Sequence, residues 1–177
     1  MGYNLKMERI DNIDDFFDKY IFEETPIYSF HIDNNNFIIV LEDPIIAEQH
    51  IYEGKNERGF IQLTFTNING YERKKGINTL YEIINFYSIS SVRGTIDVQE
   101  LTVGYGERTN KKEFFLYMGI SYGEISFCFE DIYIKKIEAY YKKENNIDLY
   151  FDKKSNIEVD FYNPFNIDFE KYQDSKF

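Results

Sequence analysis

The chain of 177 residues has no tryptophan, one cysteine and two histidines. Because Cys128 is alone, it cannot form an internal disulfide, and its place among alternating apolar residues indicates a small buried side chain rather than a nucleophile. His31 and His50 have neither a cysteine pair nor a His-Glu helix motif beside them, which argues against a zinc site. We expect a protein of a reducing compartment that holds no metal.

Long apolar runs are also missing. The longest aliphatic or aromatic run, from Phe37 to Leu41, is far shorter than the roughly 20 residues that a membrane helix needs. The start of the chain, Met1 to Lys6, lacks the apolar stretch of a secretion signal, and Lys6 stands where a myristoylation motif has serine or threonine. The sequence therefore predicts a cytoplasmic protein without a membrane partner.

Signatures of catalysis are missing as well. No serine lies in a nucleophile-elbow context, and Gly104-Tyr105-Gly106 lacks the third glycine, the lysine and the following helix of a phosphate-binding loop. Adjacent acids such as Glu130 and Asp131 point to opposite faces of a strand, so they chelate cations poorly. We expect no catalytic residue and no cofactor.

Basic residues are few for the number of acids. The chain has 31 acids and 20 bases, a net charge of -11, which argues against nucleic acid as a direct ligand and favours a basic protein partner. Residues 1–60 contain 13 acids and 5 bases, so -8 of the -11 lies in the first third. The alternative is that this acidic surface only keeps the protein in solution.

Aromatic residues, by contrast, are abundant. Phenylalanine and tyrosine together number 33, and asparagine, isoleucine and lysine are also frequent. This composition is typical of AT-rich coding sequence and indicates a bacterial or phage source. Tyrosines suit half-wet interfaces, but the coding bias explains much of their excess.

Ten residues occur in two similar copies, Gly59 to Ile68 and Gly123 to Ile132. Each copy has glycine, then apolar residues at every second position, then an amide or acid followed by isoleucine. Period two is the periodicity of a strand with one buried face. We expect a sheet-dominated α+β fold of antiparallel hairpins. An internal duplication and a chance similarity between two amphipathic strands both account for the copies.

The alternation predicts eight strands and two short helices. The strands are expected near residues 27–33, 37–42, 59–68, 95–105, 113–118, 123–130, 147–152 and 157–162. The helices are expected near 12–22, capped by Asn12, and near 78–87, capped by Asn78. The run Asn34-Asn35-Asn36 predicts the turn of the first hairpin.

Several connections have signals of their own. Apolar positions in 95–105 change parity near Gln99 and Glu100, which indicates a bulge within one strand. Asn69-Gly70 predicts a tight turn after the first copy. The stretch 132–140 continues the sheet pattern although two lysines interrupt it, and 147–151 mirrors 157–161 as a final hairpin.

The length suits one domain, because a chain of this size buries roughly 70% of its unfolded surface. We expect the domain at residues 1–165 and a polar tail at 166–177. The connection 43–58 between the two predicted strands of the first half is much longer than its counterpart in the second half. Loops of this kind often carry function.

The motifs Leu63-x-Phe65-x-Asn67-Ile68 and Phe127-x-Phe129-x-Asp131-Ile132, in a small acidic chain, resemble those of immunity proteins from bacterial polymorphic-toxin systems. The resemblance covers the central part of the chain and includes no catalytic positions. It implies a one-to-one inhibitor that occludes the active site or substrate channel of a cognate toxin, often a basic nuclease.

Acids of the first third and the tyrosines near them are the candidate partner-binding residues, because charges at the rim of an interface steer a basic partner and buried rings hold it. They are Asp11, Asp14, Asp15, Asp18, Tyr20, Glu23, Glu24, Tyr28, Glu42, Asp43, Glu48, Tyr52 and Glu53. Asp14 and Asp15 also have a structural explanation, since acids are favoured in the first turn of a helix.

Three other functions are compatible with the sequence. The first is a phage-encoded anti-defence protein that masks a nucleic-acid-binding effector by charge mimicry. The second is a β-domain that binds a small ligand or uses carboxylates and tyrosine as an enzyme. The third is an interaction domain of a larger assembly. The oligomeric state is not predicted.

Overall fold

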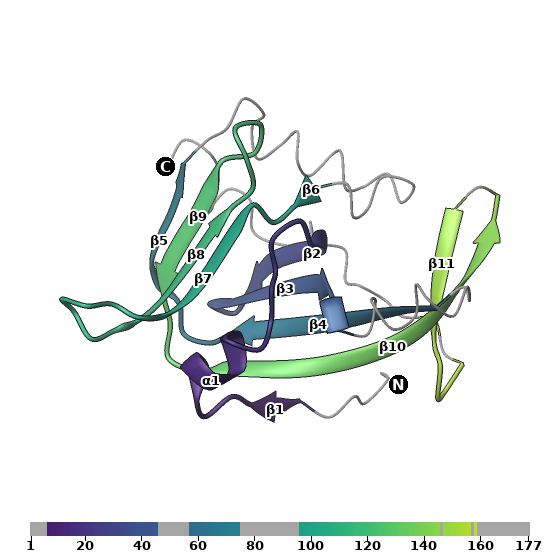
Figure 1. Cartoon of the computed structure of the whole chain (residues 1–177), viewed down its shortest axis with the longest axis horizontal. Coiled ribbons are helices and arrows are strands. Elements are labelled where there is room, and N and C mark those ends of the chain that lie inside the picture. The colour runs from purple at the N-terminus through teal and green to yellow at the C-terminus, as the bar shows by residue number, and fades with distance from the viewer. Residues whose placement is uncertain (1–6, 46–56, 75–95, 146, 157, 159–177) are drawn as a thin grey trace.

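A computed structural model of the chain describes residues 7–45, 57–74, 96–145, 147–156 and 158 (Figure 1). These residues form eleven strands and little helix, namely α1 and the helical residues Pro44 and Ile45, which confirms a sheet-dominated fold. The elements are β1 Glu8–Arg9, α1 Ile13–Phe17, β2 Pro26–Asp33, β3 Asn36–Glu42, β4 Glu57–Phe65, β5 Asn69–Lys74, β6 Ile96–Asp97, β7 Glu100–Tyr105, β8 Lys112–Tyr117, β9 Glu124–Cys128, β10 Ile132–Glu144 and β11 Ile147–Asp152.

The strands make two antiparallel sheets. The large sheet has the order β1-β10-β4-β3-β2-β6, with β11 paired to β10, and the small sheet has the order β5-β9-β8-β7. In Figure 1 the small sheet stands at the left, and β10 runs along the lower side of the large sheet toward β11 at the right. The predicted antiparallel pairing is therefore confirmed.

The main core lies between the inner faces of the two sheets. Phe37 and Phe65 of the large sheet meet Phe114 and Phe127 of the small one, and their ring centroids lie 4.8 to 5.6 Å apart across the interface. All four rings are at most 3% exposed. Alternation within each strand supplies these inward positions, because successive side chains leave opposite faces of a sheet.

A second, smaller core lies on the outer face of the large sheet. It consists of Tyr28, Val40, Phe60, Ile137 and Ala139, and the half-buried Tyr150 of β11 packs against it. The strands β3 and β4 therefore bury apolar side chains on both faces, which explains the nearly continuous apolar sequences of these two strands.

The first hairpin forms as predicted. β2 pairs with β3, and Asn34 and Asn35 between them have φ of 48° and 64°. Asparagine tolerates this left-handed backbone better than most residues, so the asparagine run turns the chain at the predicted place.

The first helix is shorter than predicted. α1 ends at Phe17 and not near residue 22, because Tyr20 and Phe22 are both buried while Ile21 between them is 77% exposed. Alternating burial of this kind requires an extended chain. The cap is as predicted: the Asn12 side chain accepts a hydrogen bond from the Asp15 amide at 3.1 Å. The second predicted helix, 78–87, lies outside the described residues.

The predicted strand 95–105 with an internal bulge is wrong. Its two parts are β6, which pairs with β2 in the large sheet, and β7, which pairs with β8 in the small sheet. Between them the Val98 amide donates to the Thr25 carbonyl, and the Gln99 amide donates to the Tyr117 carbonyl, each at 2.9 Å. The change of parity therefore marks the passage of the chain from one sheet to the other.

The first copy of the repeat is also divided. β4 ends at Phe65, and Asn69-Gly70 belongs to the next strand, β5, instead of forming the predicted tight turn. Gly70 has φ of 63°, and the pairing with β9 shifts register between Asn69 and Glu72. Asn69-Gly70 therefore forms a bulge within β5. A bulge and a tight turn both need a residue with left-handed backbone, so the same dipeptide is compatible with either.

The second strand of the predicted final hairpin, 157–162, lies outside the described residues except for Glu158. β11 pairs with β10 along its whole length, and a single bridge from Phe151 to Glu158 is the pairing described toward the following segment. The two lysines of 132–140 do not interrupt β10, since Lys136 is exposed and Lys135 is half-buried on opposite faces. The tail 166–177 lies outside the described residues.

The strand order repeats between the sheets. The series β2-β3-β4 lies side by side in the large sheet, and β7-β8-β9 does so in the small sheet. After β4 the chain crosses to the small sheet as β5 beside β9, and after β9 it crosses to the large sheet as β10 beside β4. The two sequence copies thus occupy corresponding places. Their origin by duplication stays a prediction.

Candidate functional site

The outer face of the small sheet carries a hollow lined by residues of all four of its strands. In β8 the side chains of Phe114 and Leu116 are buried in the main core, at 1% and 0% exposure. Glu113 and Phe115 therefore point to the opposite, outer face, where Glu113 is exposed and Phe115 half-buried. The same alternation applies to each of the four strands.

Strand pairing brings the outward residues together in rows. Phe115 lies opposite Ser126 of β9 on one side and Thr102 of β7 on the other, and Ser126 lies opposite Glu72 of β5. In the next row Glu113 lies between Cys128 and Gly104.

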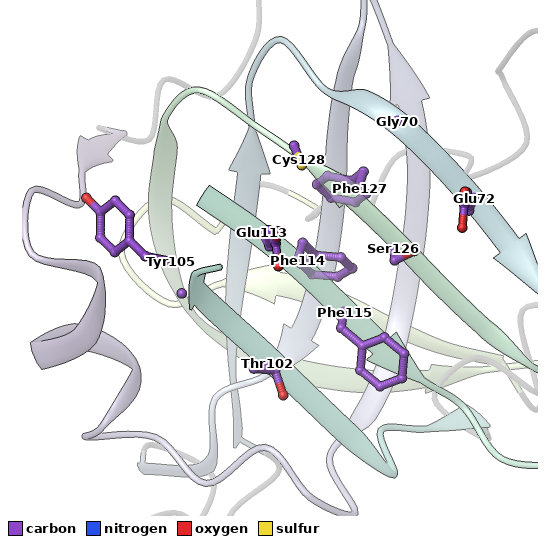
Figure 2. Close-up of a pocket in the computed structure, with 11 residues that line it drawn as sticks. Gly70, Glu72, Thr102, Tyr105, Glu113, Phe114, Phe115, Ser126, Phe127 and Cys128 are labelled. Carbon is purple, nitrogen blue, oxygen red and sulfur yellow. The ribbon is translucent and has the colours of Figure 1, made fainter. Parts of the chain in front are cut away.

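These rows enclose a hollow of about 440 Å³ (Figure 2). Its shape follows from the sequence, because Gly70, Gly104, Ser126 and Cys128 have little or no side chain to fill the space beside Phe115. The lining residues are Gly70, Glu72, Thr102, Gly104, Tyr105, Glu113, Phe114, Phe115, Ser126, Phe127 and Cys128.

The hollow is acidic. Glu72 and Glu113 contribute carboxylates, and none of the lining residues, all of which the structure describes, is basic. The nearest lysine on β5, Lys74, is engaged by Glu124, with Nζ 3.1 Å from Oε1. The Lys112 ammonium donates instead to the Glu130 carbonyl at 2.7 Å.

Glu113 is oriented by the loop between β7 and β8. The Thr109 hydroxyl donates a hydrogen bond of 3.1 Å to Glu113 Oε1. Gly106 makes room for this contact, since a Cβ at that position would lie 2.6 Å from Thr109 Oγ1 and would also clash with the Glu113 carboxylate.

A second candidate surface is the acidic segment from Asp11 to Glu24. Its six predicted partner-binding acids are all exposed: Asp11, Asp14, Asp15, Asp18, Glu23 and Glu24. Arg9 pairs with Asp11 at 2.9 Å, and both side chains remain largely in solvent. Ile21, 77% exposed, lies between Asp18 and Glu23 in this segment.

Of the three predicted tyrosines, the two that the structure describes, Tyr20 and Tyr28, are core residues and not surface anchors. Tyr20 is 8% exposed and stacks on Phe22 with ring centroids 5.3 Å apart. Tyr28 is 7% exposed and packs edge to face on Phe60 at 4.7 Å. Burial raises the pKa of Tyr28 far above the usual range for tyrosine. The rings fill space between strands, so they are unavailable to a partner.

Asp43 is buried as well, at 1% exposure. Its Oδ1 accepts a hydrogen bond of 3.0 Å from the Ile45 amide, and its own amide donates to the Gly59 carbonyl at 2.8 Å. The prediction that Asp43 meets a partner is therefore wrong, because the side chain organises the end of β3. Glu48, Tyr52 and Glu53 lie outside the described residues.

Glu42 belongs to a half-buried group at the edge of the large sheet. Its Oε1 lies 3.9 Å from Arg58 Nε. Burial raises the pKa of Glu42, Arg58 opposes that increase, and Asp97 adds to it. Burial also raises the pKa of Asp97, with a further contribution from Glu24. The structure thus brings Glu24 and Glu42 near a carboxylate that was not predicted.

The sequence reasoning missed the residues of the hollow. Glu72, Glu113 and Phe115 each sit at an outward position of an alternating strand, which is a signal available in the sequence. Their proximity, however, depends on which strands pair and in which register, and neither was predicted.

Comparisons of the chain with protein-family models, with curated proteins and with solved structures gave no match. In the described ranges, no three or more histidine, cysteine, aspartate or glutamate side chains are grouped so that they could hold a metal ion. Nor does any helix there have the length and apolar character needed to cross a bilayer.

Proposed function

We propose that the chain is a protein-binding module that docks a basic partner protein through its acidic N-terminal segment. The observation that carries the proposal is the exposure of all six predicted acids between Asp11 and Glu24. Lys19 and Arg9 are the bases described in this part of the chain, so the segment has a strongly negative local field.

The segment combines steering charges with an apolar anchor. Exposed carboxylates accelerate the approach of a positively charged surface, and their effect falls as salt screens it. Ile21 offers an exposed aliphatic side chain, and covering it with a partner would stabilise the complex. Apolar groups surrounded by charged residues are the usual anatomy of an interface.

The most specific form of the proposal is an immunity protein that neutralises a cognate toxin by occluding its active site. A nuclease presents positive charge to hold phosphate, so an acidic inhibitor competes for the same surface. The residues that carry the resemblance, such as Leu63, Phe65 and Phe127, are buried in the core. They support the scaffold of such an inhibitor, and the acidic segment supplies its docking surface.

The test has two steps. The chain is used to capture its partner from the native host, and the captured protein is then expressed alone and together with the chain. We expect a basic protein that arrests growth alone and is neutralised by co-expression. A reproducible partner that is harmless alone would contradict the immunity function, and a captured nucleic-acid-binding defence protein would favour charge mimicry instead.

A further inference from the structure

Asn69 and Gly70 lie at the start of β5, where the chain has just crossed from the large sheet, and they are the one Asn-Gly dipeptide in the sequence. Both residues are exposed, and Gly70 has φ of 63°. Apart from its chain neighbours, no atom lies within 4 Å of the place that a Cβ on Gly70 would take. Gly70 also lines the hollow on the outer face (Figure 2), so water reaches the peptide bond between the two residues.

The pairing of β5 with β9 leaves this peptide bond outside the regular ladder. The register passes from Asn69 opposite Cys128 to Glu72 opposite Ser126, so β5 has one extra residue at this point. In such a bulge the extra residue lacks a partner on the neighbouring strand. Gly70 has no Cβ, so its backbone can also adopt conformations that other residues avoid. The geometry therefore leaves the backbone nitrogen of Gly70 room to approach the side chain of Asn69.

We propose that Asn69 is a site of spontaneous deamidation, a covalent modification that converts its side-chain amide into a carboxylate. The Gly70 nitrogen gives up its proton to a base in the solvent and attacks Asn69 Cγ. The new N–Cγ bond closes a succinimide ring. The Cγ–Nδ2 bond breaks, and the amide group leaves as ammonia after taking a proton from water. This inference goes beyond the proposed function and does not depend on it.

Water then opens the ring, and no oxidant or reductant takes part. Addition of water at Cγ gives aspartate, whereas addition at the main-chain carbonyl carbon of Asn69 gives isoaspartate, whose main chain runs through Cβ and Cγ. Overall one water is consumed and one ammonia is released. Either product adds a negative charge at an exposed position, and the longer main chain of isoaspartate lies within a bulge that already departs from regular pairing. The main core therefore need not change.

Asn67, which precedes this site closely, is exposed too, but the structure protects it. Its Nδ2 donates to Glu130 Oε2 at 2.6 Å, so the group that would leave is held in place. The nitrogen that would attack belongs to Ile68, and this amide donates to the Asn35 carbonyl at 3.0 Å. Ile68 is also β-branched and 4% exposed, so its side chain crowds that nitrogen. The Asn69 side chain, by contrast, forms no hydrogen bond with the described residues.

The experiment incubates the full folded chain in mildly alkaline buffer and follows both asparagines by mass spectrometry. Trypsin releases Asn67 and Asn69 in one peptide, Gly59 to Arg73, so fragment ions compare the two sites directly. We expect Asn69 to convert roughly tenfold faster than Asn67 or more, and an isoaspartyl methyltransferase to label the product. N69Q is the matched control, because it keeps a side-chain amide whose ring closure is slower, and it should lose both signals.

A second sample, unfolded in urea, separates the effect of the structure from that of the sequence. We expect Asn69 to convert in the folded chain at a rate within about tenfold of its rate in urea. Conversion in urea with none in the folded chain would show that β5 holds the site closed, and it would overturn the proposal. Equal conversion of Asn67 and Asn69 in the folded chain, or an isoaspartyl label that persists in N69Q, would overturn it as well.

Discussion

Thr66 and Asp131 hydrogen-bond to each other at the point where both copies of the repeat leave their sheets. The Thr66 amide donates to the Asp131 carbonyl at 2.9 Å, and the Asp131 amide donates to the Thr66 hydroxyl at 3.1 Å. Just before them in the chain lie β4 and β9, and just after them the chain enters β5 and β10. The pair therefore ties together the two crossings that connect the large sheet to the small one.

Removing the Thr66 hydroxyl should destabilise this crossing. T66V deletes the acceptor of the Asp131 amide while keeping the volume of the side chain, and we expect a loss of about 1 kcal/mol in the free energy of unfolding. Urea denaturation followed by circular dichroism measures it. T102V, at an exposed threonine of β7, is the control and should change stability little. Equal effects of the two substitutions would show that the Thr66 contact contributes nothing.

The core between the sheets should depend on Phe114. Its ring stacks on Phe127 at 4.5 Å and meets Phe65 at 4.8 Å, so it contacts both sheets. F114A leaves a cavity and should cost about 3–5 kcal/mol, whereas F114L should cost clearly less. Thermal or chemical unfolding separates the two variants. A loss below about 1 kcal/mol for F114A would contradict the packing of the sheets described here.

The short helix α1 should depend on its cap. N12A removes the acceptor of the Asp15 amide and should lower stability by about 1 kcal/mol. N12S and N12D restore an acceptor at the same position and should recover most of the loss. The measurement is the midpoint of chemical unfolding, and failure of N12S to recover stability would assign the effect to something other than capping.

Glu42 should make stability depend on pH. Burial raises its pKa above the ordinary value of 4.5, so the folded state binds this proton more tightly than the unfolded state does. Its stabilising contribution is therefore full below pH 4.5 and is lost as the pH rises through the raised pKa. E42Q should be more stable than the wild type at neutral pH, with a smaller difference at pH 4. If the stability difference between E42Q and the wild type instead shrank toward neutral pH, folding would lower the pKa of Glu42. That result would contradict the burial of the carboxylate.

Charge reversal in the acidic segment should slow association with a basic partner. D14K/D15K/D18K inverts exposed charges of the segment, and we expect the association rate at low salt to fall by roughly tenfold, with a smaller effect as salt increases. Stopped-flow or surface-binding kinetics with the captured partner measures it. E107K/E138K/E144K changes the net charge equally at exposed positions elsewhere. Equal slowing by both triple variants would indicate a general charge effect instead of a docking surface.

Local patterns in the sequence determined the strands and their buried faces. Alternation places Phe114 and Phe127 inward and Phe115 and Ser126 outward, and this follows from period two alone. The hairpin at Asn34 and the cap at Asn12 are equally local, because each depends on the backbone preference or hydrogen bonding of a few neighbouring residues.

Only the tertiary structure decided which strands pair. A bulge and a passage between sheets produce the same change of parity before Glu100 in the sequence. The structure distinguishes them, because β6 pairs with β2 in the large sheet and β7 pairs with β8 in the small sheet. β11 likewise pairs with β10, a pairing that the sequence did not predict. The hollow is a product of that pairing, since Glu72 and Glu113 are far apart in the chain and line the same hollow only because β5 and β8 both pair with β9. Side-chain alternation is a property of each strand, whereas register is set by the contacts of the whole core.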